Sequence, residues 1–179
     1  MSKTLNRRKF IKTSAVAGAA AIITPKTLFS AKKNKKIKIG FIGTGLRGQW
    51  MVHLSTKYPE VSIPAICDID KEMIGNTLKI LNDAGRAEPR IYSNGDEDFL
   101  NMINNEDLDA VYIATPWEWH HPMAISSMEN GLHVGTEVPA AITVQDCWDL
   151  VNTSEKTNKN CMIMENVCYR RDVMAVLNM

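Results

Sequence analysis

The stretch that most constrains this chain is residues 38–48, where an apolar run meets three spaced glycines in the order Lys-Ile-Gly-Phe-Ile-Gly-Thr-Gly-Leu-Arg-Gly. A Gly-x-Gly-x-x-Gly pattern after an apolar run is typical of a buried strand, a phosphate-binding turn and a helix. We expect Gly43 to allow the tight turn, Gly45 to let the backbone approach a pyrophosphate, and Gly48 to let the helix pack on the strand. The helix N-terminus would add free N–H groups for the phosphates. Such turns also recur without a ligand, so the motif alone is a weak signal.

The composition is that of a globular protein with one domain. Of the 179 residues, 45% are apolar and 23% are charged, which is enough for a sizeable core. The net charge of +1, with most of the basic excess in residues 1–38, argues against a nucleic-acid-binding surface. The four cysteines have no CxxC spacing and no accompanying histidine cluster, which favours buried thiols over a metal site. Because apolar periodicity continues up to Met179, we expect the N-terminal piece of a longer protein.

Residues 1–31 are predicted to be a signal peptide. A basic segment at 6–12, Asn-Arg-Arg-Lys-Phe-Ile-Lys, precedes an apolar run at 15–23 that is too short to span a bilayer permanently. The paired arginines resemble the signal read by the twin-arginine export machinery, which would deliver the protein to the periplasm or cell envelope; a basic amphipathic tail is the alternative. Residues 32–36 would be a linker. This route carries folded proteins to a compartment without a nicotinamide pool. A dinucleotide protein sent along it should therefore hold its cofactor tightly and regenerate it in each turnover.

Strand and helix patterns alternate along residues 37–168, which predicts an α/β fold, a doubly wound parallel sheet of six strands with right-handed crossovers. The expected strands are 38–42, 61–67, 90–92, 108–114, 132–135 and 160–164. The expected helices are 46–57, 71–84, 96–103, 122–130, one opened by Thr143 as N-cap, and 169–179. Ligands of such sheets lie beyond the carboxyl ends of the strands, where this chain carries glycine or polar residues. The glycine turn is therefore predicted to bind a dinucleotide.

Asp68, at the end of the second expected strand, is the candidate for the ribose hydroxyls. An acidic residue about 20–25 residues past the first glycine takes this role in dinucleotide-binding sheets. Its carboxylate would repel a 2′-phosphate, which favours NAD over NADP. The alternative is a turn or N-cap residue, although Asp70 is the better cap for the helix that follows.

The most unusual stretch is residues 115–122, Thr-Pro-Trp-Glu-Trp-His-His-Pro, which we expect as a loop at a strand end. Two tryptophans, a carboxylate and two histidines suit stacking on a flat ring and binding a polar ligand. The alternative is that Trp117 and Trp119 are packing residues and that His121 stands in for a helix N-cap. We expect no metal site, because His120 and His121 are adjacent and no third ligand is evident.

The loops at the expected strand ends resemble a known family. Those at 43–48, 115–120 (Thr-Pro-x-x-x-His) and 137–139 (Glu-x-Pro) are similar to the oxidoreductase superfamily of glucose–fructose oxidoreductase and inositol dehydrogenase. The whole run at 115–122, together with Gly-Thr-Glu-Val-Pro-Ala-Ala at 135–141 and Glu-Asn-Val-Cys-Tyr-Arg-Arg at 165–171, resembles glycoside hydrolase family 109, the NAD-dependent α-N-acetylgalactosaminidases. The resemblance extends from about residue 37 to Met179.

The resemblance implies a Rossmann domain with a retained NAD that oxidises a sugar carbon transiently, after which the aglycone is eliminated, water adds and the ketone is reduced again. By the family's pattern, Leu46 and Arg47, beside Gly45, would lie on the pyrophosphate and Asp68 on the adenosine ribose. Trp117, Glu118, Trp119 and His120 would line the cofactor, Glu137 and Val138 the nicotinamide ribose and ring region, and Asn166 the nicotinamide end.

Val138 marks a departure from the wider superfamily. Its dehydrogenases typically carry Glu-Lys-Pro, whose lysine serves as acid and base for the sugar hydroxyl, whereas valine cannot transfer a proton. The hydrolase family shares this departure. The catalytic residues are therefore unassigned and expected beyond Met179, in a C-terminal domain to which residues 169–179 would begin the connection.

Three functions stay open at this point. The leading one is an exported glycosidase acting on terminal α-N-acetylgalactosamine or related glycosides. The alternatives are an exported sugar oxidoreductase with tightly bound NAD(P), and a non-catalytic NAD-binding module, which describes this chain taken alone. The expected partners are an α-N-acetylgalactosaminide carbohydrate and the twin-arginine machinery, with no nucleic acid and with a homo-oligomer left open.

Overall fold

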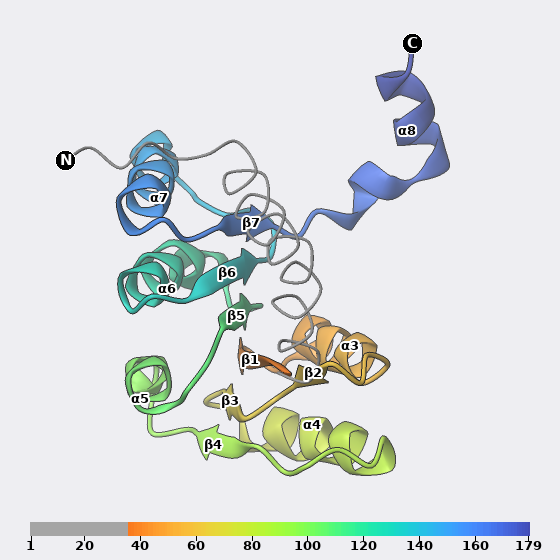
Figure 1. The fold of residues 1–179 in the computed structure, drawn as a ribbon, viewed down its shortest axis with the longest axis vertical. Helices are drawn as coiled ribbons and strands as arrows, with labels where there is room; N and C mark the ends of the chain where they lie inside the picture. The colour runs from red at the N-terminus through yellow and green to blue at the C-terminus, as the bar shows by residue number, and fades with distance from the viewer. Residues whose placement is uncertain (1–35) are drawn as a thin grey trace, which may run out of the picture. The chain divides into compact units, whose positions relative to one another are not determined.

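Parallel strands form a single seven-stranded sheet in a computed structural model that describes residues 36–179 (Figure 1). The strands are β1 (Ile37–Ile42), β2 (Val61–Ser62), β3 (Ala65–Cys67), β4 (Arg90–Tyr92), β5 (Ala110–Ile113), β6 (His133–Thr136) and β7 (Cys161–Ile163). The helices are α3 (Leu46–Ser55), α4 (Lys71–Asp83), α5 (Asp98–Asn105), α6 (Trp117–Glu129), α7 (Val144–Thr157) and α8 (Arg171–Leu177), with a 3₁₀ turn η2 (Asn166–Tyr169). The predicted signal peptide at 1–31 and all but the last residue of the linker lie outside the described residues.

The order of the strands in the sheet is β4-β3-β1-β5-β6-β7, with β2 also paired to β1. The chain builds outward from β1 to β4, then returns to the other side of β1 with β5 and continues outward to β7 (Figure 1). This confirms the doubly wound parallel sheet. The direction of winding reverses between β1 and β5, and in such sheets a crevice opens at that point.

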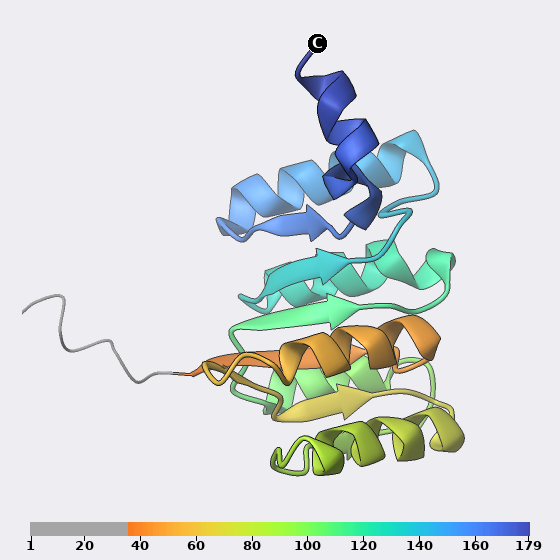
Figure 2. The same cartoon turned by 90° about the vertical axis from the view of Figure 1, so that its right-hand side faces the viewer.

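Helices cover both faces of the sheet. Helices α3 and α4 lie on one face, and α5, α6 and α7 lie on the other (Figure 1). Each layer has its own apolar core: Phe41, Val52, Ile66 and Leu81 are buried on the first side, and a larger cluster that includes Met102 is buried on the second. The arrowheads of the sheet point the same way in Figure 2, so the carboxyl ends of the strands share one edge. Within residues 36–179, no helix is long and apolar enough to cross a membrane.

The second expected strand, 61–67, is wrong as a single element. It is divided into β2 and β3, which both pair in parallel with β1, opposite its start and its end. Pro64 lies between them and has no N–H to donate to a ladder, which interrupts the strand. Its carbonyl still accepts a hydrogen bond from the Arg90 N–H at 2.8 Å, which joins the interruption to β4.

The expected loop at 115–122 is also wrong in part. Helix α6 begins at Trp117 with Pro116 as its N-cap residue, so the tryptophans and histidines lie in its first five residues, and Pro122 lies inside the helix. The alternative role of His121 as an N-cap is wrong for the same reason. Sequence reasoning placed the start at Pro122, because proline favours the first turn of a helix. Position 122 is only the sixth residue of α6, and the Glu118 carbonyl that it leaves without a donor belongs to an exposed residue.

The helix caps follow local sequence closely. Asp70 caps α4 by accepting hydrogen bonds from the N–H groups of Glu72 and Met73, and Thr143 and Asp146 form a reciprocal capping box at the start of α7. Both caps confirm the predictions. At the C-terminal end, the expected helix 169–179 is shorter: η2 comes first and α8 covers only Arg171–Leu177.

Candidate cofactor site

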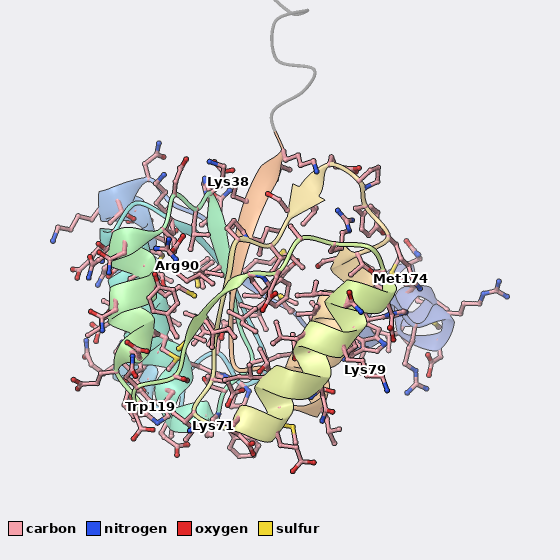
Figure 3. All side chains as sticks on the ribbon, turned by 90° about the horizontal axis from the view of Figure 1, so that it is seen from below. Lys38, Lys71, Lys79, Arg90, Trp119 and Met174 are labelled. Atoms are coloured by element: carbon pink, nitrogen blue, oxygen red, sulfur yellow. The ribbon has the colours of Figure 1, made fainter. Side chains whose placement is uncertain are left out.

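The carboxyl edge of the sheet contains a cavity of about 280 Å³ at the switch point between β1 and β5. It is lined from several elements, by Ile42, Gly43, Gly45, Cys67, Asp68, Ile69, Met73, Gly95, Asp96, Ala114, Thr115, Pro116, Trp119 and Met123. Trp119 and Lys71, the first residue of α4, lie at this edge, and Lys38 in β1 lies at the opposite one (Figure 3). The predicted glycine turn, Asp68 and Trp119 thus meet around one cavity.

The three glycines of the turn have three different surroundings. Gly43 has φ +86°, and a Cβ there would lie 2.6 Å from the Ala114 carbonyl oxygen at the end of β5. A Cβ on Gly48 would lie 2.1 Å from the Gly43 carbonyl oxygen, so α3 packs directly on the turn. A Cβ on Gly45 would meet nothing within 4 Å. The turn and packing roles of Gly43 and Gly48 are confirmed, and Gly45 borders open space in the cavity.

Helix α3 starts at this open space. Gly45 is its N-cap residue and makes no side-chain cap hydrogen bond, so the first N–H groups of α3 have no capping acceptor. These groups and the positive end of the helix dipole favour an anion at the cavity. No acidic residue lies in the first turn, where Arg47 is instead the second helical residue.

Asp68 follows β3 directly and is held in one orientation. The N–H and the hydroxyl of Thr44 both donate to its Oδ2, and the Asp70 N–H donates to Oδ1 at 2.9 Å. Thr44 is fully buried, and the Gly43 N–H donates to the Cys67 carbonyl at 2.8 Å. The carboxylate therefore joins the glycine turn to the end of β3. Each oxygen retains capacity for a further donor such as a ribose hydroxyl.

The two tryptophans of α6 line two different cavities. Trp119 lines the main cavity and packs edge-to-face against Phe99 of α5, with ring centroids 6.4 Å apart. Trp117 is 62% exposed and lines a smaller hollow of about 160 Å³, with Arg47, Ala114, Thr115, His120, Glu137 and Val138. Glu118 is exposed and lines neither hollow. Trp119 thus has the packing role that was left open, and it borders the cavity as well.

His120 is almost completely buried, with 1% of its surface exposed. Its Nδ1 lies 2.7 Å from the Pro139 carbonyl oxygen and its Nε2 lies 2.8 Å from the Thr115 carbonyl oxygen. The ring therefore fastens the loop after β5 to the turn after β6. It forms a wall of the smaller hollow, and its position supports the loops on both sides.

Glu137 and Arg47 meet across the end of β5. The Arg47 Nε donates to Glu137 Oε1 at 2.6 Å, and the Glu137 N–H donates to the Ile113 carbonyl at 2.9 Å. Val138 follows with its side chain partly exposed in the smaller hollow. This hollow therefore holds a paired charge and a valine, and no proton-transfer group at position 138.

Asn166 lies farther from the crevice than the other predicted residues. It opens η2 after β7, is exposed, and lines neither hollow. Since β6 lies between β5 and β7, the structure places Asn166 at the same sheet edge but beyond the Glu137 turn. The chain described here therefore does not bring Asn166 together with the glycine turn.

Several cavity residues were missed from sequence. Thr44 orients Asp68, and Ile69, Met73 and Asp96 line the cavity; Thr44 occupies a variable position of the glycine motif and the other three belong to no recognised motif. Ile69 had one usable signal, since an apolar residue between two aspartates after a strand is unusual for an exposed turn. Cys67 also lines the cavity. Burial, with Asp98 and Asp68 nearby, raises its thiol pKa to about 12, so it is no nucleophile at neutral pH.

Away from the crevice, His121 lies beside two carboxylates of α7. Its Nδ1 is 3.9 Å from Asp146 Oδ1 and its Nε2 is 3.7 Å from Asp149 Oδ2. Within residues 36–179 this is the group of side chains whose ligand atoms come together closely enough for a metal ion. Asp146 and Asp149 are therefore two further ligand-type groups beside His121, whereas His120 and His121 do not converge, and the expectation of no metal site stays a prediction. These contacts join α6 to α7, and they are ion pairs only when the imidazole is protonated.

Comparison with known proteins matches this architecture. Residues 37–165 match the model of the oxidoreductase family with an NAD-binding Rossmann fold, and residues 4–24 match the twin-arginine translocation signal sequence. The second match indicates export by the twin-arginine route, to the periplasm or cell envelope. The first makes NAD the cofactor of this domain.

Curated relatives carry the family name expected from the loops. An alpha-N-acetylgalactosaminidase of Tannerella forsythia is 44% identical over 97% of this chain, and a glycosyl hydrolase family 109 protein of Saccharopolyspora erythraea is 39% identical over 99%. The chain spans 41% and 43% of these two relatives.

Solved structures agree in fold. An NAD-binding protein from Listeria innocua superposes with a TM-score of 0.66 at 28% identity, over 81% of this chain and 40% of that one. Myo-inositol dehydrogenase from Lactobacillus casei, solved with NAD(H) and myo-inositol, gives a TM-score of 0.66 at 21% identity, over 80% of this chain and 40% of that one, and shows the fold alone. The glycine turn at the switch point, the relatives and the fold lead to one assignment: the chain belongs to the oxidoreductase family with an NAD-binding Rossmann fold, and its curated relatives bear the name of glycosyl hydrolase family 109.

Proposed function

We propose that the full-length protein carrying this chain is an exported glycosidase that hydrolyses terminal α-N-acetylgalactosamine or a related glycoside, with NAD held in the crevice between β1 and β5. The observation that carries this proposal is Val138 in the Glu-Val-Pro turn. A conventional sugar dehydrogenase of the superfamily would have its proton-transfer lysine here, and the valine side chain lies in the hollow beside Arg47 and Glu137. The names of the relatives support the choice of glycoside.

The cavity fits a dinucleotide in shape and in charge. Gly45 faces open space where a Cβ would meet nothing, at the start of a helix with no side-chain cap. Asp68 is preorganised by Thr44 and Asp70 to accept ribose hydroxyls, and its charge disfavours a 2′-phosphate. Trp119 and Met73 provide apolar wall area beside it. These residues would hold the adenosine and pyrophosphate parts of NAD.

The remaining predicted residues would act around the smaller hollow. Arg47 would neutralise the pyrophosphate, Trp117 and His120 would border the cofactor, and Glu137 and Val138 would bound the nicotinamide ribose and ring. Glu118, which lines neither hollow, would border the cofactor only from outside the smaller one. Asn166 would complete the nicotinamide end only if the segment after β7 comes closer in the full-length protein. When bound, NAD supplies reversible hydride transfer, which suits a cycle of oxidation, elimination, hydration and reduction that returns the cofactor to its starting state.

Export supports a retained cofactor. The twin-arginine signal sends a folded protein to a compartment in which no nicotinamide pool can exchange with the site. A cycle that regenerates NAD at each turnover needs no such pool, whereas net oxidation of a sugar does.

We also propose that residues 37–168 are the NAD-binding domain and that the longer relatives' remaining length corresponds to a catalytic domain covering the β7–α8 side. Helix α8 buries none of its residues, and Val176 and Leu177 are 68% and 73% exposed. Relatives more than twice as long as this chain have the additional sequence to cover such a face. The catalytic acid and base would then lie beyond Met179.

The test is glycoside cleavage by the full-length protein with its NAD in place. Incubation with an aryl α-N-acetylgalactosaminide should release the aglycone without net formation of NADH, and denaturing the protein should release NAD in a one-to-one ratio. Retained NAD with no aglycone release from any α-glycoside would contradict the proposal.

The second candidate is an exported sugar oxidoreductase with tightly held NAD(P). It would accumulate a ketone product and reduced cofactor, with no aglycone release. The two functions therefore differ in a single assay, in which absorbance of NADH and released aglycone are followed together. A non-catalytic NAD-binding module would show neither signal while still retaining nucleotide.

A further inference from the structure

Arg47 is held on two sides in a way that no sequence motif indicates. Its Nε donates to Glu137 Oε1 at 2.6 Å, and its Cζ lies 4.7 Å from the centroid of the Trp50 ring. Trp50 is three residues after Arg47 on α3, so both side chains lie on the same helix face. Glu137 comes from the turn after β6, two strands away from β1 in the sheet.

Both supports are firmly placed. The Glu137 side chain is only 13% exposed, and its backbone N–H is bonded to Ile113 in β5. The Trp50 ring is partly exposed on a helix whose Gly48 packs against the glycine turn. A cation–π contact and a charge-assisted hydrogen bond act on different parts of one guanidinium, since the ring covers its face and the carboxylate takes its edge.

One edge of the guanidinium is left for a ligand. Arginine has five N–H donors, and the contact with Glu137 uses the one on Nε. No hydrogen bond from the two Nη groups to another residue is found within residues 36–179, and Arg47 lines the hollow beside the start of α3. Two Nη groups on a fixed plane match the oxygens of a phosphate in a bidentate manner.

We propose that Trp50 and Glu137 are positioning residues, the Arg47 holder, which orient the guanidinium so that its Nη groups bind the pyrophosphate of NAD and slow its release. The proposal rests on the placement of NAD under the proposed function. The opposite possibility is a latch, in which the ion pair with Glu137 competes with the cofactor for Arg47 and must break before NAD can bind. The two assignments give effects of opposite sign.

The experiment measures NAD release from the NAD-loaded full-length protein, with a soluble dehydrogenase and its substrate consuming each NAD that leaves. Trp50→Leu should accelerate release about fivefold, because it removes a partly exposed cation–π contact. Trp50→Phe keeps an aromatic face and should stay within about twofold of the parent. Glu137→Gln should also accelerate release, since the charge that holds Nε is lost. The acceleration should be larger with Arg47 present than in an Arg47→Ala background, which separates positioning of Arg47 from the contact of Glu137 with the nicotinamide ribose.

A structural role alone would not give the pattern expected in an Arg47→Ala background. There, Trp50→Leu should have no further effect on release, because its action passes through the guanidinium. The matched control is Tyr58→Leu, which removes another exposed aromatic ring just after α3, and it should release NAD like the parent. Thermal unfolding of each variant checks that the fold is intact.

Slower release or faster uptake of NAD in Glu137→Gln would overturn the holder in favour of the latch. An equal effect of Trp50→Leu with and without Arg47 would also overturn it, as would failure of Trp50→Phe to restore retention. Glycoside cleavage is scored separately on the parent. A parent that retains NAD but cleaves no glycoside contradicts the proposed function and leaves the release rates to decide on the holder.

Discussion

Helices α3 and α8 both carry apolar residues, yet only α3 buries one of them completely. Val52 of α3 is fully buried against Phe41 and Ile66 of the sheet, whereas α8 has no buried residue. Helix α3 lies on the sheet beside α4, while α8 stands away from it beyond β7 (Figures 1 and 2). An apolar side chain on a helix is therefore buried only where the fold supplies a partner surface, which α3 has and α8 lacks within residues 36–179.

The largest expected effect is on the free energy of unfolding, when a valine in each helix is replaced by aspartate. Val52→Asp places a charge in a closed core and should lower the free energy of unfolding by about 4 kcal/mol or more. Val176→Asp in α8 should change it by no more than about 0.5 kcal/mol in residues 36–179. Urea denaturation followed by circular dichroism measures both.

The full-length protein sharpens that comparison. If α8 is covered there, as proposed, Val176→Asp should become clearly destabilising while Val52→Asp remains severe. Equal stability of the full-length protein with and without Val176→Asp would contradict the covered face.

The second effect compares the two glycines at the start of α3, Gly48 and Gly45, in stability and in NAD retention. Gly48→Ala brings a Cβ to 2.1 Å from a backbone oxygen and should cost about 1–3 kcal/mol of stability. Gly45→Ala meets no atom within 4 Å, so in the NAD-free protein it should cost only about 0.5 kcal/mol of stability, the difference between glycine and alanine at a helix N-cap. It should instead reduce NAD retention about tenfold or more, because the methyl group occupies the approach of the pyrophosphate. A loss of stability in NAD-free Gly45→Ala as large as that in Gly48→Ala would refute this division of roles.

The third effect concerns two aspartates at helix starts. Asp98 is 4% exposed and accepts hydrogen bonds from the side chain of Asn101 and from the N–H and side chain of Asn94, which lower its pKa. Asp98→Ala should cost about 1–3 kcal/mol at neutral pH, because buried donors lose their acceptor. Asp146 in the α7 capping box should matter less, since it is more exposed.

The pH dependence has a definite sign. The folded-state pKa of Asp98 lies below its ordinary value of 3.8, so its contribution is fully present above that value and is lost as the pH falls through the folded pKa. The pKa of Asp146 is also lowered, first by the Thr143 N–H. Below pH 3.8, the free energy of unfolding of Asp98→Ala should therefore fall less steeply with pH than that of the parent. The same pH dependence of stability in Asp98→Ala and in the parent would contradict this role of Asp98.

The smallest effect is on reactivity and leaves stability untouched. Burial raises the pKa of the Cys67 thiol to about 12, while Cys147 and Cys168 are exposed. Iodoacetamide at pH 8 should modify the two exposed thiols quickly and Cys67 only after unfolding. Peptide mass analysis at successive times gives the order. Early modification of Cys67 would show that the β3 end opens more readily than the core around it.

Much of the cofactor site could be predicted because its determinants are local. Gly43 and Gly48 are set by the backbone of one turn, and Asp70 and Thr143 cap helices within three residues of themselves. Asp68 was found from its spacing to the first glycine. In each case the interaction that decides the structure lies within a few residues or follows from the repeat of strand and helix.

The errors arose where distant residues decide. Proline can interrupt a strand or precede it, and it can begin a helix or lie inside one. Pairing with β1 decides the position of Pro64 in its strand, and packing of α6 against α7 decides the position of Pro122 in its helix. The contact of Thr44 with Asp68 crosses 24 residues and that of Arg47 with Glu137 crosses 90. The spacing rule that located Asp68 does not say which donors hold its carboxylate, and no spacing rule connects Arg47 with Glu137.

The sequence by itself determined the parallel sheet, the edge at which its ligand lies, the export signal and the preference for NAD, because glycine torsions, strand–helix alternation and one carboxylate impose them. Only the tertiary structure decided that Gly45 borders open space, that His120 fastens two loops, and that Trp50 and Glu137 hold Arg47. The physical reason is range. Backbone preferences act between neighbours in sequence, whereas burial, ion pairing and ring contacts depend on which elements the fold brings together.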